Sequence, residues 1–184
     1  ELELPCAPGA QAYLPRCMSA FVGADITTAL LASGICSGRE TRMLTDIGTN
    51  GEIALWHEGR LSCCSTAAGP AFEGANLSQG MQGAPGAIDH AWAVDGALEV
   101  HTIGGTAPKG ICGSGVADVL AGLLELGRLD ESGLLDDGED AWPLAPGVAL
   151  TQGDVRQVQL AKSAVRAGME TLMARSGLAP EDVV

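Results

Sequence analysis

Aromatic and basic residues are both scarce in this sequence. Aromatic side chains make up only 3% of the 184 residues, and ten Lys and Arg residues stand against 23 Asp and Glu residues. With so few rings the core must be aliphatic, and a hydrophobic content of 46% is enough for a substantial core. A nucleic-acid-binding surface needs concentrated Lys and Arg. The scattered basic residues and the net charge of −13 therefore argue against a nucleic-acid partner.

Metal-binding cysteine spacings and long apolar runs are also missing. No two of the six cysteines form a C-x-x-C pair, and this spacing is poor for zinc or an iron–sulfur cluster. We interpret the cysteines as mostly buried, reduced thiols, which fits a reducing compartment. Without a transmembrane run or a signal peptide, we expect a cytoplasmic protein with no membrane partner. The cysteines are Cys6, Cys17, Cys36, Cys63, Cys64 and Cys112.

Both ends of the sequence favour a piece cut from a longer polypeptide. Residues 1–22 contain several Pro and Gly residues, which predict irregular structure. The sequence begins without Met, at Glu1. At the other end, Val183–Val184 has the pattern of the first residues of a strand, so we expect that strand to continue beyond the sequence.

Apolar periodicity predicts a mixture of helices and strands between these ends. Three consecutive strands with glycine turns predict an antiparallel meander. In its third strand, Cys63 and Cys64 are expected to point in opposite directions, one buried and one exposed. Residues 130–147 are predicted to be an acidic loop. The expected elements are a helix from Gly23 to Gly34 capped by Asp25, strands at Met43–Ile47, Glu52–His57 and Arg60–Ser65, a helical piece from Gly74 to Met81, a hairpin of Ala91–Val94 and Ala97–Ile103, and helices from Val116 to Leu126 and from Thr151 to Gly177, the last with a capping box at Asp154.

The segment Leu44–Ile53 carries the most chemistry. A buried strand ends at Asp46, and Gly48 and Gly51 allow a bend whose backbone N–H groups, with Thr49 and Asn50, could surround phosphate oxygens. Asp46 is placed to hold Mg²⁺, through water, because Mg²⁺ keeps several waters. Glu52 begins the return strand and could orient water or the metal shell. The alternative is a plain hairpin with a solvated aspartate.

Two further sites are candidates for nucleotide contacts. Gly113-Ser114-Gly115 precedes a predicted helix, so its N–H groups could receive an anion, although a tight turn with close packing explains it equally. Glu73 could face the nucleotide or an attacking water, or it could simply be solvated. The three histidines lie far apart in sequence and are interpreted as surface or structural residues.

Several motifs, in order along the chain, carry a resemblance to a known family: Val22–Ile26, Thr45–Glu52, Ser65–Ala75, Gly110–Gly115 and Asp154–Lys162. Together they resemble the C-terminal ATPase domain of the reductive activators of corrinoid proteins, 2Fe-2S ferredoxin-containing proteins of the actin, sugar-kinase and heat-shock-chaperone superfamily. The resemblance covers nearly the whole chain.

The resemblance implies an α/β fold of the ribonuclease-H-like, actin-like ATPase type, with a mixed sheet and flanking helices. Residues 1–40 would end the preceding subdomain and its linker, and residues 41–184 would form the second subdomain, truncated before its last strand. Residues 46–52 would be the second phosphate loop. The first phosphate loop would precede Glu1 and an adenosine loop would follow Val184, so the chain alone would hold an incomplete, inactive site.

The implied function is ATP-dependent return of a corrinoid protein to its cob(I)alamin state. ATP and Mg²⁺ would be the ligands, a corrinoid protein the partner and a homodimer a possible assembly, while a [2Fe–2S] cluster is expected only in an N-terminal domain outside this chain. Asp46 and Glu52 would be the catalytic carboxylates, Asp46 the metal ligand, and Gly48, Thr49, Asn50, Gly51, Glu73, Gly113, Ser114 and Gly115 would contact the nucleotide. Water would attack the γ-phosphate, with charge stabilised by the Gly48–Gly51 amides and the metal. A small-molecule kinase of the same fold and a non-catalytic protein-binding module remain alternatives.

Overall fold

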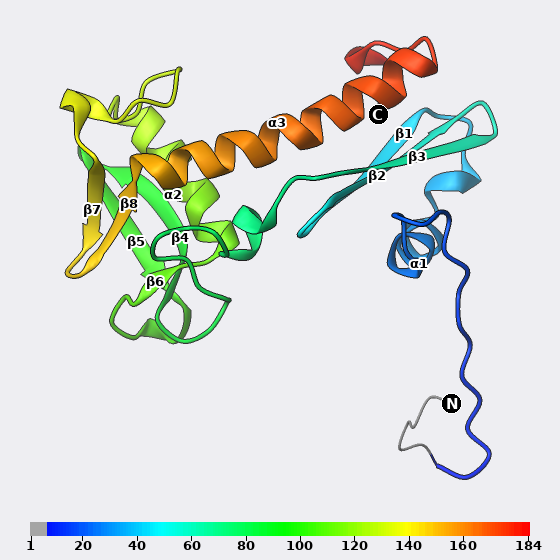
Figure 1. Ribbon diagram of the computed structural model, residues 1–184, viewed down its shortest axis with the longest axis horizontal. Coiled ribbons are helices and arrows are strands. Elements are labelled where there is room, and N and C mark those ends of the chain that lie inside the picture. Colours follow the sequence, from blue (N-terminus) through cyan, green and yellow to red (C-terminus); the bar gives the residue numbers. More distant parts are fainter. Residues whose placement is uncertain (1–6) are drawn as a thin grey trace.

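A computed structural model describes residues 7–184, apart from the side chain of Asp137. The fold is α/β, as predicted, with a long C-terminal helix that runs across the molecule from one group of strands to the other (Figure 1). Short 3₁₀ turns lie between the larger elements of residues 7–184, and one more follows the last helix; they are η1 (Ile35–Ser37), η2 (Pro70–Glu73), η3 (Ile103–Gly105), η4 (Asp136–Gly138) and η5 (Pro180–Asp182). The main elements are α1 (Ala24–Ser33), β1 (Arg42–Ile47), β2 (Gly51–His57), β3 (Arg60–Thr66), β4 (Ala87–Val94), β5 (Ala97–Thr102), β6 (Gly110–Ile111), α2 (Gly113–Glu125), β7 (Ala141–Ala145), β8 (Val148–Thr151) and α3 (Gln152–Arg175).

The first sheet is the predicted antiparallel meander. Its order is β1-β2-β3, with Asp46 opposite Glu52 and Glu52 opposite Ser65. The β2–β3 turn places Glu58 and Gly59 at φ values of 48° and 76°, the left-handed conformations that a two-residue hairpin of matching twist requires. All three strands agree with the sequence prediction to within two residues.

Helices cover both faces of this sheet. Ile53 and Leu55 of β2 join the main core on the side of α3, whereas Ala54 packs with Ile26 and Leu30 of α1. Such alternation follows from the period of two along a strand. Because each face has its own helix, the central strand β2 is buried on both sides, whereas β1 and β3 are half-buried or exposed.

The adjacent cysteines show the same alternation. Cys64 packs against the main core and Cys63 against the α1 cluster, which confirms their opposite directions. The prediction of one buried and one exposed thiol is wrong, because both faces are covered and both thiols are half-buried. Burial, followed by the charge of Cys63, raises the pKa of Cys64. The expectation of mostly buried cysteines is also wrong, because only Cys112 is buried among the five described; Cys6 lies outside the described residues.

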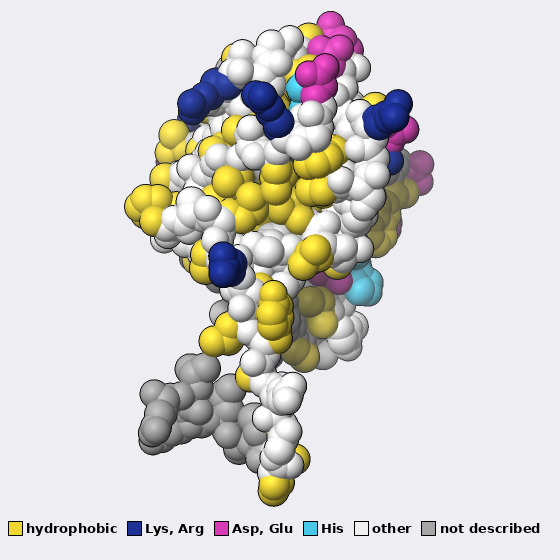
Figure 2. Space-filling view, turned by 90° about the vertical axis from the view of Figure 1, so that its right-hand side faces the viewer, with side chains coloured by type: hydrophobic (Ala, Val, Ile, Leu, Met, Phe, Trp, Pro, Cys, Tyr) yellow, Lys and Arg dark blue, Asp and Glu magenta, His cyan; other side chains and the backbone are white. Residues whose placement is uncertain are grey.

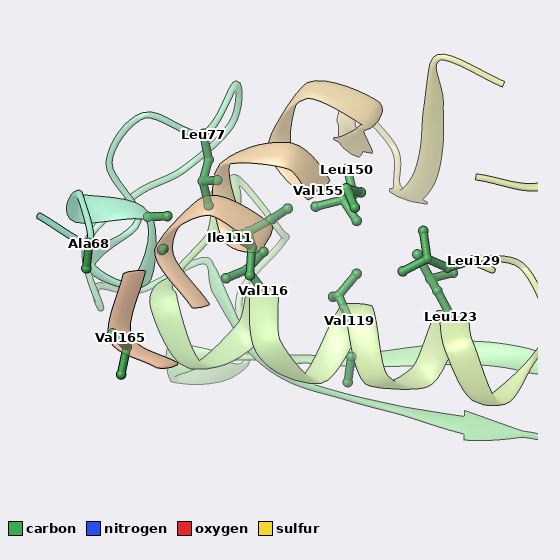
Figure 3. Close-up of a cluster of buried hydrophobic side chains, with 14 of the residues drawn as sticks. Ala68, Leu77, Ile111, Val116, Val119, Leu123, Leu129, Leu150, Val155 and Val165 are labelled. Atoms are coloured by element: carbon green, nitrogen blue, oxygen red, sulfur yellow. The ribbon is translucent and has the colours of Figure 1, made fainter. Parts of the chain in front are cut away.

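A mixed sheet forms the other half, in agreement with the prediction. Its order is β5-β4-β6, with β4 and β5 antiparallel and β4 and β6 parallel. The predicted Asp95-Gly96 turn has φ values of 49° and 81°. Helix α2 packs along β4, and its side chains, among them Val116 and Leu123, lie opposite Leu150 and Val155 in the core (Figure 3).

Helix α3 begins with the predicted capping box. The Thr151 hydroxyl accepts a hydrogen bond from the Asp154 N–H (3.1 Å), and the Asp154 carboxylate accepts one from the Thr151 N–H (2.9 Å). Its buried residues, among them Val158, Val165 and Leu172, follow the expected spacing and contact both halves of the core. Gly177, at φ 69°, lies just beyond its end.

Several local predictions are wrong. The helical piece from Gly74 to Met81 is absent from the described chain: the 3₁₀ turn η2 (Pro70–Glu73) ends before Gly74, and the φ values of 75° at Gly74 and 60° at Asn76 are incompatible with a helix there. Gly23, not Asp25, is the N-cap of α1, and Asp25 lies in its first turn. Helix α2 begins at Gly113, because glycine lets its first turn approach other backbone closely. The acidic region 130–147 contains β7, which pairs with β8 and places Pro143 at an exposed position.

The described N-terminal segment, residues 7–22, is irregular apart from an isolated bridge between Ser19 and Val22, as predicted. Among residues 7–184, no helix combines the length and the apolar character needed to cross a membrane. At the end of the molecule formed by β1–β3 and α1, apolar side chains gather between widely spaced charged ones (Figure 2).

Candidate functional site

The β1–β2 turn is an exposed loop of three residues. Ile47 pairs with Gly51, which leaves Gly48, Thr49 and Asn50 to make the bend. The Gly48 N–H donates to the Asn50 carbonyl (3.0 Å), so this amide is already used within the turn. The N–H groups of Thr49 and Asn50 make no hydrogen bond to residues 7–184. The turn therefore presents two free donors to its surroundings.

The 3₁₀ turn η2 holds this loop from one side. Thr49 Oγ1 donates to Glu73 Oε2 (2.5 Å), and the Gly69 N–H donates to the Thr49 carbonyl (3.0 Å). Two residues that are 24 positions apart in sequence are thus in direct contact. Glu73 is exposed, so the same carboxylate stays open to a ligand above the turn.

Asp46, Glu52 and Ser65 form a row across the three strands. Paired residues of neighbouring antiparallel strands point to the same face, here the face that carries α1 further along. Ser65 Oγ donates to Glu52 Oε1 (3.2 Å), and Asp46 is exposed. Two carboxylates directly opposite each other repel and destabilise a hairpin. A cation beside them would remove that repulsion.

This pair suits Mg²⁺ in its ligand chemistry, because Mg²⁺ prefers carboxylate oxygens and keeps several waters. Among residues 7–184, no three His, Cys, Asp or Glu side chains converge as a metal site. The protein would thus supply one or two ligands, and water and phosphate the others.

The two glycines of the motif have different structural roles. A Cβ at Gly51 would lie 2.6 Å from Thr66 Oγ1 and 2.9 Å from Cγ2 of Val165 in α3, so glycine lets the hairpin pack against that helix. A Cβ at Gly48 would meet nothing nearer than 3.9 Å, where Glu73 Oε1 lies. Neither glycine needs a left-handed φ. The space above Gly48 is therefore open to a ligand, whereas Gly51 is fixed by packing.

The N-terminus of α2 lies on the other side of η2. A Cβ at Gly113 would lie 1.6 Å from the Phe72 carbonyl oxygen, and one at Gly115 would lie 2.0 Å from the Ile88 carbonyl oxygen. The Ser114 hydroxyl donates to the Asp89 carbonyl (3.0 Å). Close packing thus accounts for both glycines, and their contact with a nucleotide stays a prediction.

Sequence reasoning missed a cluster of two histidines and two aspartates beside this helix. His90 and His101 are opposite each other on β4 and β5, with ring centres 6.3 Å apart. His90 Nδ1 is 2.9 Å from Asp118 Oδ2, and His101 Nδ1 is 2.7 Å from Asp89 Oδ1. The hydrogen bond with His101 lowers the pKa of Asp89. A hairpin centred on Asp95-Gly96 pairs residue 90 with residue 101. The predicted turn therefore already implied that the two histidines are neighbours.

The residues of this site lie within a region that matches a known protein family. Residues 40–184 match the family model described as the C-terminal domain of RACo, the ASKHA domain. The chain belongs to this family. The match includes the β1–β2 turn, η2 and the start of α2, so every predicted site residue lies inside the ASKHA domain.

Relatives of this ASKHA domain are named for corrinoid activation. The chain is 36% identical to the corrinoid activation enzyme RamQ of Eubacterium limosum, with 100% of the chain and 35% of that protein aligned. It is 31% identical to the Co(II) methylated amine-specific corrinoid protein reductase of Methanosarcina barkeri, over 92% of the chain and 35% of that protein. The chain spans about a third of the length of these relatives.

A solved structure has the same fold. The reductive activator for corrinoid, iron-sulfur protein superimposes with a TM-score of 0.81 and 34% sequence identity, over 93% of this chain and 31% of that one. The α/β ASKHA fold predicted from the motifs is thereby confirmed. The roles of individual site residues stay predictions.

Proposed function

We propose that this chain is the ASKHA part of an ATP-dependent activator that returns a corrinoid protein to its reduced state. The family match over residues 40–184 carries the proposal, together with a relative named as a corrinoid activation enzyme that aligns with the whole chain. ATP would be the source of free energy and a corrinoid protein the partner. The electron would come through a [2Fe–2S] domain outside this chain.

The β1–β2 turn would bind the phosphates of ATP. The free N–H groups of Thr49 and Asn50 are available to oxygen atoms, and the space beside Gly48 is open. Glu73, as the acceptor of the Thr49 hydroxyl, would hold the turn in shape. Main-chain donors fixed in this way stabilise charge on a transferring phosphoryl group without reorganising.

The carboxylate row would serve the metal and the attacking water. Asp46 would hold Mg²⁺ through water, and Glu52, kept in place by Ser65, would orient the nucleophilic water. Bound Mg²⁺ would neutralise negative charge on the phosphates. This division fits the positions of the two residues, one at the end of β1 and one at the start of β2.

We also propose that residues 41–184 form one ribonuclease-H-like subdomain whose sheet continues at the free edge of β1. Two observations support it. The Val184 N–H donates to the Thr41 carbonyl (2.9 Å), beside the start of β1. A hollow of about 260 Å³, lined by Met43, Leu44 and Val184, borders this edge. A further strand here would fill the hollow, and the ATP site would be completed by residues outside the chain.

The test is Mg-ATP binding and hydrolysis by the full-length protein, with and without a corrinoid partner protein. D46N and E52Q should each lower the hydrolysis rate by about 10²-fold or more, because each removes a group that acts in the transition state. Matched controls are D95N and E99Q, which change exposed carboxylates on the β4–β5 hairpin. These controls should retain full activity.

Three outcomes contradict the proposal. Failure of the full-length protein to bind Mg-ATP favours a protein-binding module. Phosphate transfer to a sugar or short acid favours a small-molecule kinase. Equal activity of D46N and D95N removes Asp46 from the site.

A further inference from the structure

A polar cavity lies at the opposite end of β2 from the β1–β2 turn. It has a volume of about 530 Å³, within the roughly 300–1,000 Å³ range of small-molecule sites. His57 and Arg60 line it from the β2–β3 hairpin, and Arg175 and Ser176 from the end of α3. The family motifs do not include these residues.

Two arginines in this cavity have no partner. The guanidinium groups of Arg60 and Arg175 make no hydrogen bond or ion pair with residues 7–184, although the sequence holds 23 acidic and only ten basic residues. By contrast, Arg42, Arg128 and Arg166 each pair with a carboxylate. A guanidinium presents a fixed fork of donors that matches phosphate and carboxylate oxygens. Two unpaired guanidinium groups in one cavity therefore favour the binding of an oxyanion.

Neighbouring groups add donors and leave little opposing charge. The hydroxyls of Ser62 and Ser176 line the same cavity and have no side-chain hydrogen bond within the described chain. Glu58 is the one acidic residue in the lining; its side chain is 82% exposed and lies 3.9 Å from His57 Nε2. The local charge thus stays positive.

Hydrogen bonds to three of the last four carbonyls of α3 reduce the repulsion between this helix end and an anion. The Ser176 N–H donates to Leu172 and Met173, and the Gly177 N–H donates to Ala174. These bonds satisfy carbonyls that would otherwise carry the negative end of the helix dipole.

Contacts within the chain hold the β2–β3 end of the cavity in place without a ligand. The two-residue turn between His57 and Arg60 fixes the hairpin end, and His57 Nδ1 lies 2.9 Å from Thr41 Oγ1.

A second hollow of about 310 Å³ shares Ser62, Arg175 and Ser176 with the cavity and adds Leu172 to the lining. This hollow gives room for the organic part of a ligand.

We propose that this cavity, called the Arg60–Arg175 cavity, binds a small organic anion that carries phosphate or carboxylate groups. The two guanidinium groups contact the oxyanion, and the hydroxyls of Ser62 and Ser176 complete its hydrogen bonds. The site is separate from the β1–β2 turn and does not depend on the function proposed for it.

Calorimetric titration of the protein with inorganic phosphate and with citrate, at constant ionic strength, tests the proposal. At least one probe should bind with a dissociation constant of about 1 mM or lower. R60A/R175A should weaken that binding by about tenfold or more. The matched control K109A/K162A removes the same net charge at exposed lysines outside the cavity. It should bind like the unaltered protein.

The probe that binds identifies the ligand group, phosphate or carboxylate, and either supports the site. Binding weaker than about 1 mM for both probes overturns the proposal. So does equal weakening in both double variants, which indicates a general charge effect. Unchanged binding in R60A/R175A places the anion elsewhere, for example at the β1–β2 turn. R60Q and R175Q, with thermal unfolding of each variant, separate loss of binding from loss of fold.

Discussion

One buried carboxylate at the start of α3 holds together parts of the chain that are 76 residues apart. Asp154 is only 3% exposed. It accepts hydrogen bonds from the Ser78 N–H and hydroxyl, both at 2.6 Å, in addition to the Thr151 N–H. The loop after η2 is thereby fixed to the first turn of α3. The motif Asp154–Lys162, although far from the β1–β2 turn in sequence, thus helps to hold the loop after η2 in place.

We predict that D154N destabilises the protein. Burial alone would raise the pKa of Asp154, but the hydrogen bonds from Ser78 and Thr151 outweigh it and lower the pKa below its ordinary value of 3.8. The amide loses charge-assisted bonds, so the free energy of unfolding at pH 7 should fall by about 1–3 kcal/mol. Denaturant unfolding measures this difference.

The pH dependence follows from the same shift. A depressed native pKa adds stability above the unfolded pKa, and that stability is lost as the pH falls through the native pKa. The difference between D154N and the unaltered protein should therefore shrink below about pH 4. S78A, which removes only the hydroxyl donor, should show a smaller loss with the same trend. A constant difference down to pH 2 contradicts this account.

Individual contacts were the hardest features to foresee. The Thr49–Glu73 and Ser78–Asp154 pairs join residues whose distance depends on how η2 is oriented, and no local pattern records that orientation. Asp46 opposite Glu52 is different, because the predicted hairpin already implied it. Side chains within one hairpin could be placed from the sequence, and those across loops could not.

At the scale of elements, the start of α2 is defined by close backbone contact. Gly115 leaves no room for a Cβ next to β4, since the Ile88 carbonyl oxygen would be 2.0 Å away. Gly153 in α3 is a useful contrast, because a Cβ there would meet only Thr151 Oγ1, at 3.5 Å. The two glycines lie in the first turns of the two largest core helices.

We predict opposite effects of alanine at these two glycines. G115A should lower the free energy of unfolding by about 1–3 kcal/mol, because backbone must move to admit the methyl group. G153A should raise it by up to about 1 kcal/mol, because alanine is the better helix former. Thermal unfolding of both variants measures this. A neutral G115A would show that α2 can shift away from β4 at little cost.

Most strands and the long helices could be predicted from the sequence. Short elements, and elements whose composition is typical of a loop, could not. The β1–β3 meander, the β4–β5 hairpin and α3 each combine periodicity with clear turn or cap residues. Strand β7 lies in an acidic segment with a proline, so its five residues resemble a loop. It forms because β8 pairs with it and Trp142 packs against the core, beneath Arg128.

At the scale of the whole molecule, α3 joins the two groups of strands. It contacts β2 and β3 on one side and β8 and η2 on the other. Gly168 lies at the closest point, where a Cβ would be 2.5 Å from Thr66 Cγ2 and 2.6 Å from Ile53 Cδ1. One continuous core runs through both halves.

We predict that the two halves unfold together. Two double variants each keep a single tryptophan. W92F/W142F keeps Trp56, which reports on β2, and W56F/W92F keeps Trp142, which reports on β7. Fluorescence transitions of the two proteins should coincide. G168A should shift both by the same amount, a loss of about 1–3 kcal/mol. If G168A moves only the Trp56 transition, the halves are independent.

The Cys64 thiol donates to the Gly168 carbonyl, 104 residues further along the chain, and a ribosome needs time to make the residues between them. Ribosomes add about 5–20 residues per second, so the meander leaves the ribosome roughly 5–20 s before the helix that covers its inner face. During that interval Ile53 and Leu55 face water on a nascent chain. A folding assistant that shields apolar strands would act in this window, before translation reaches the end of α3.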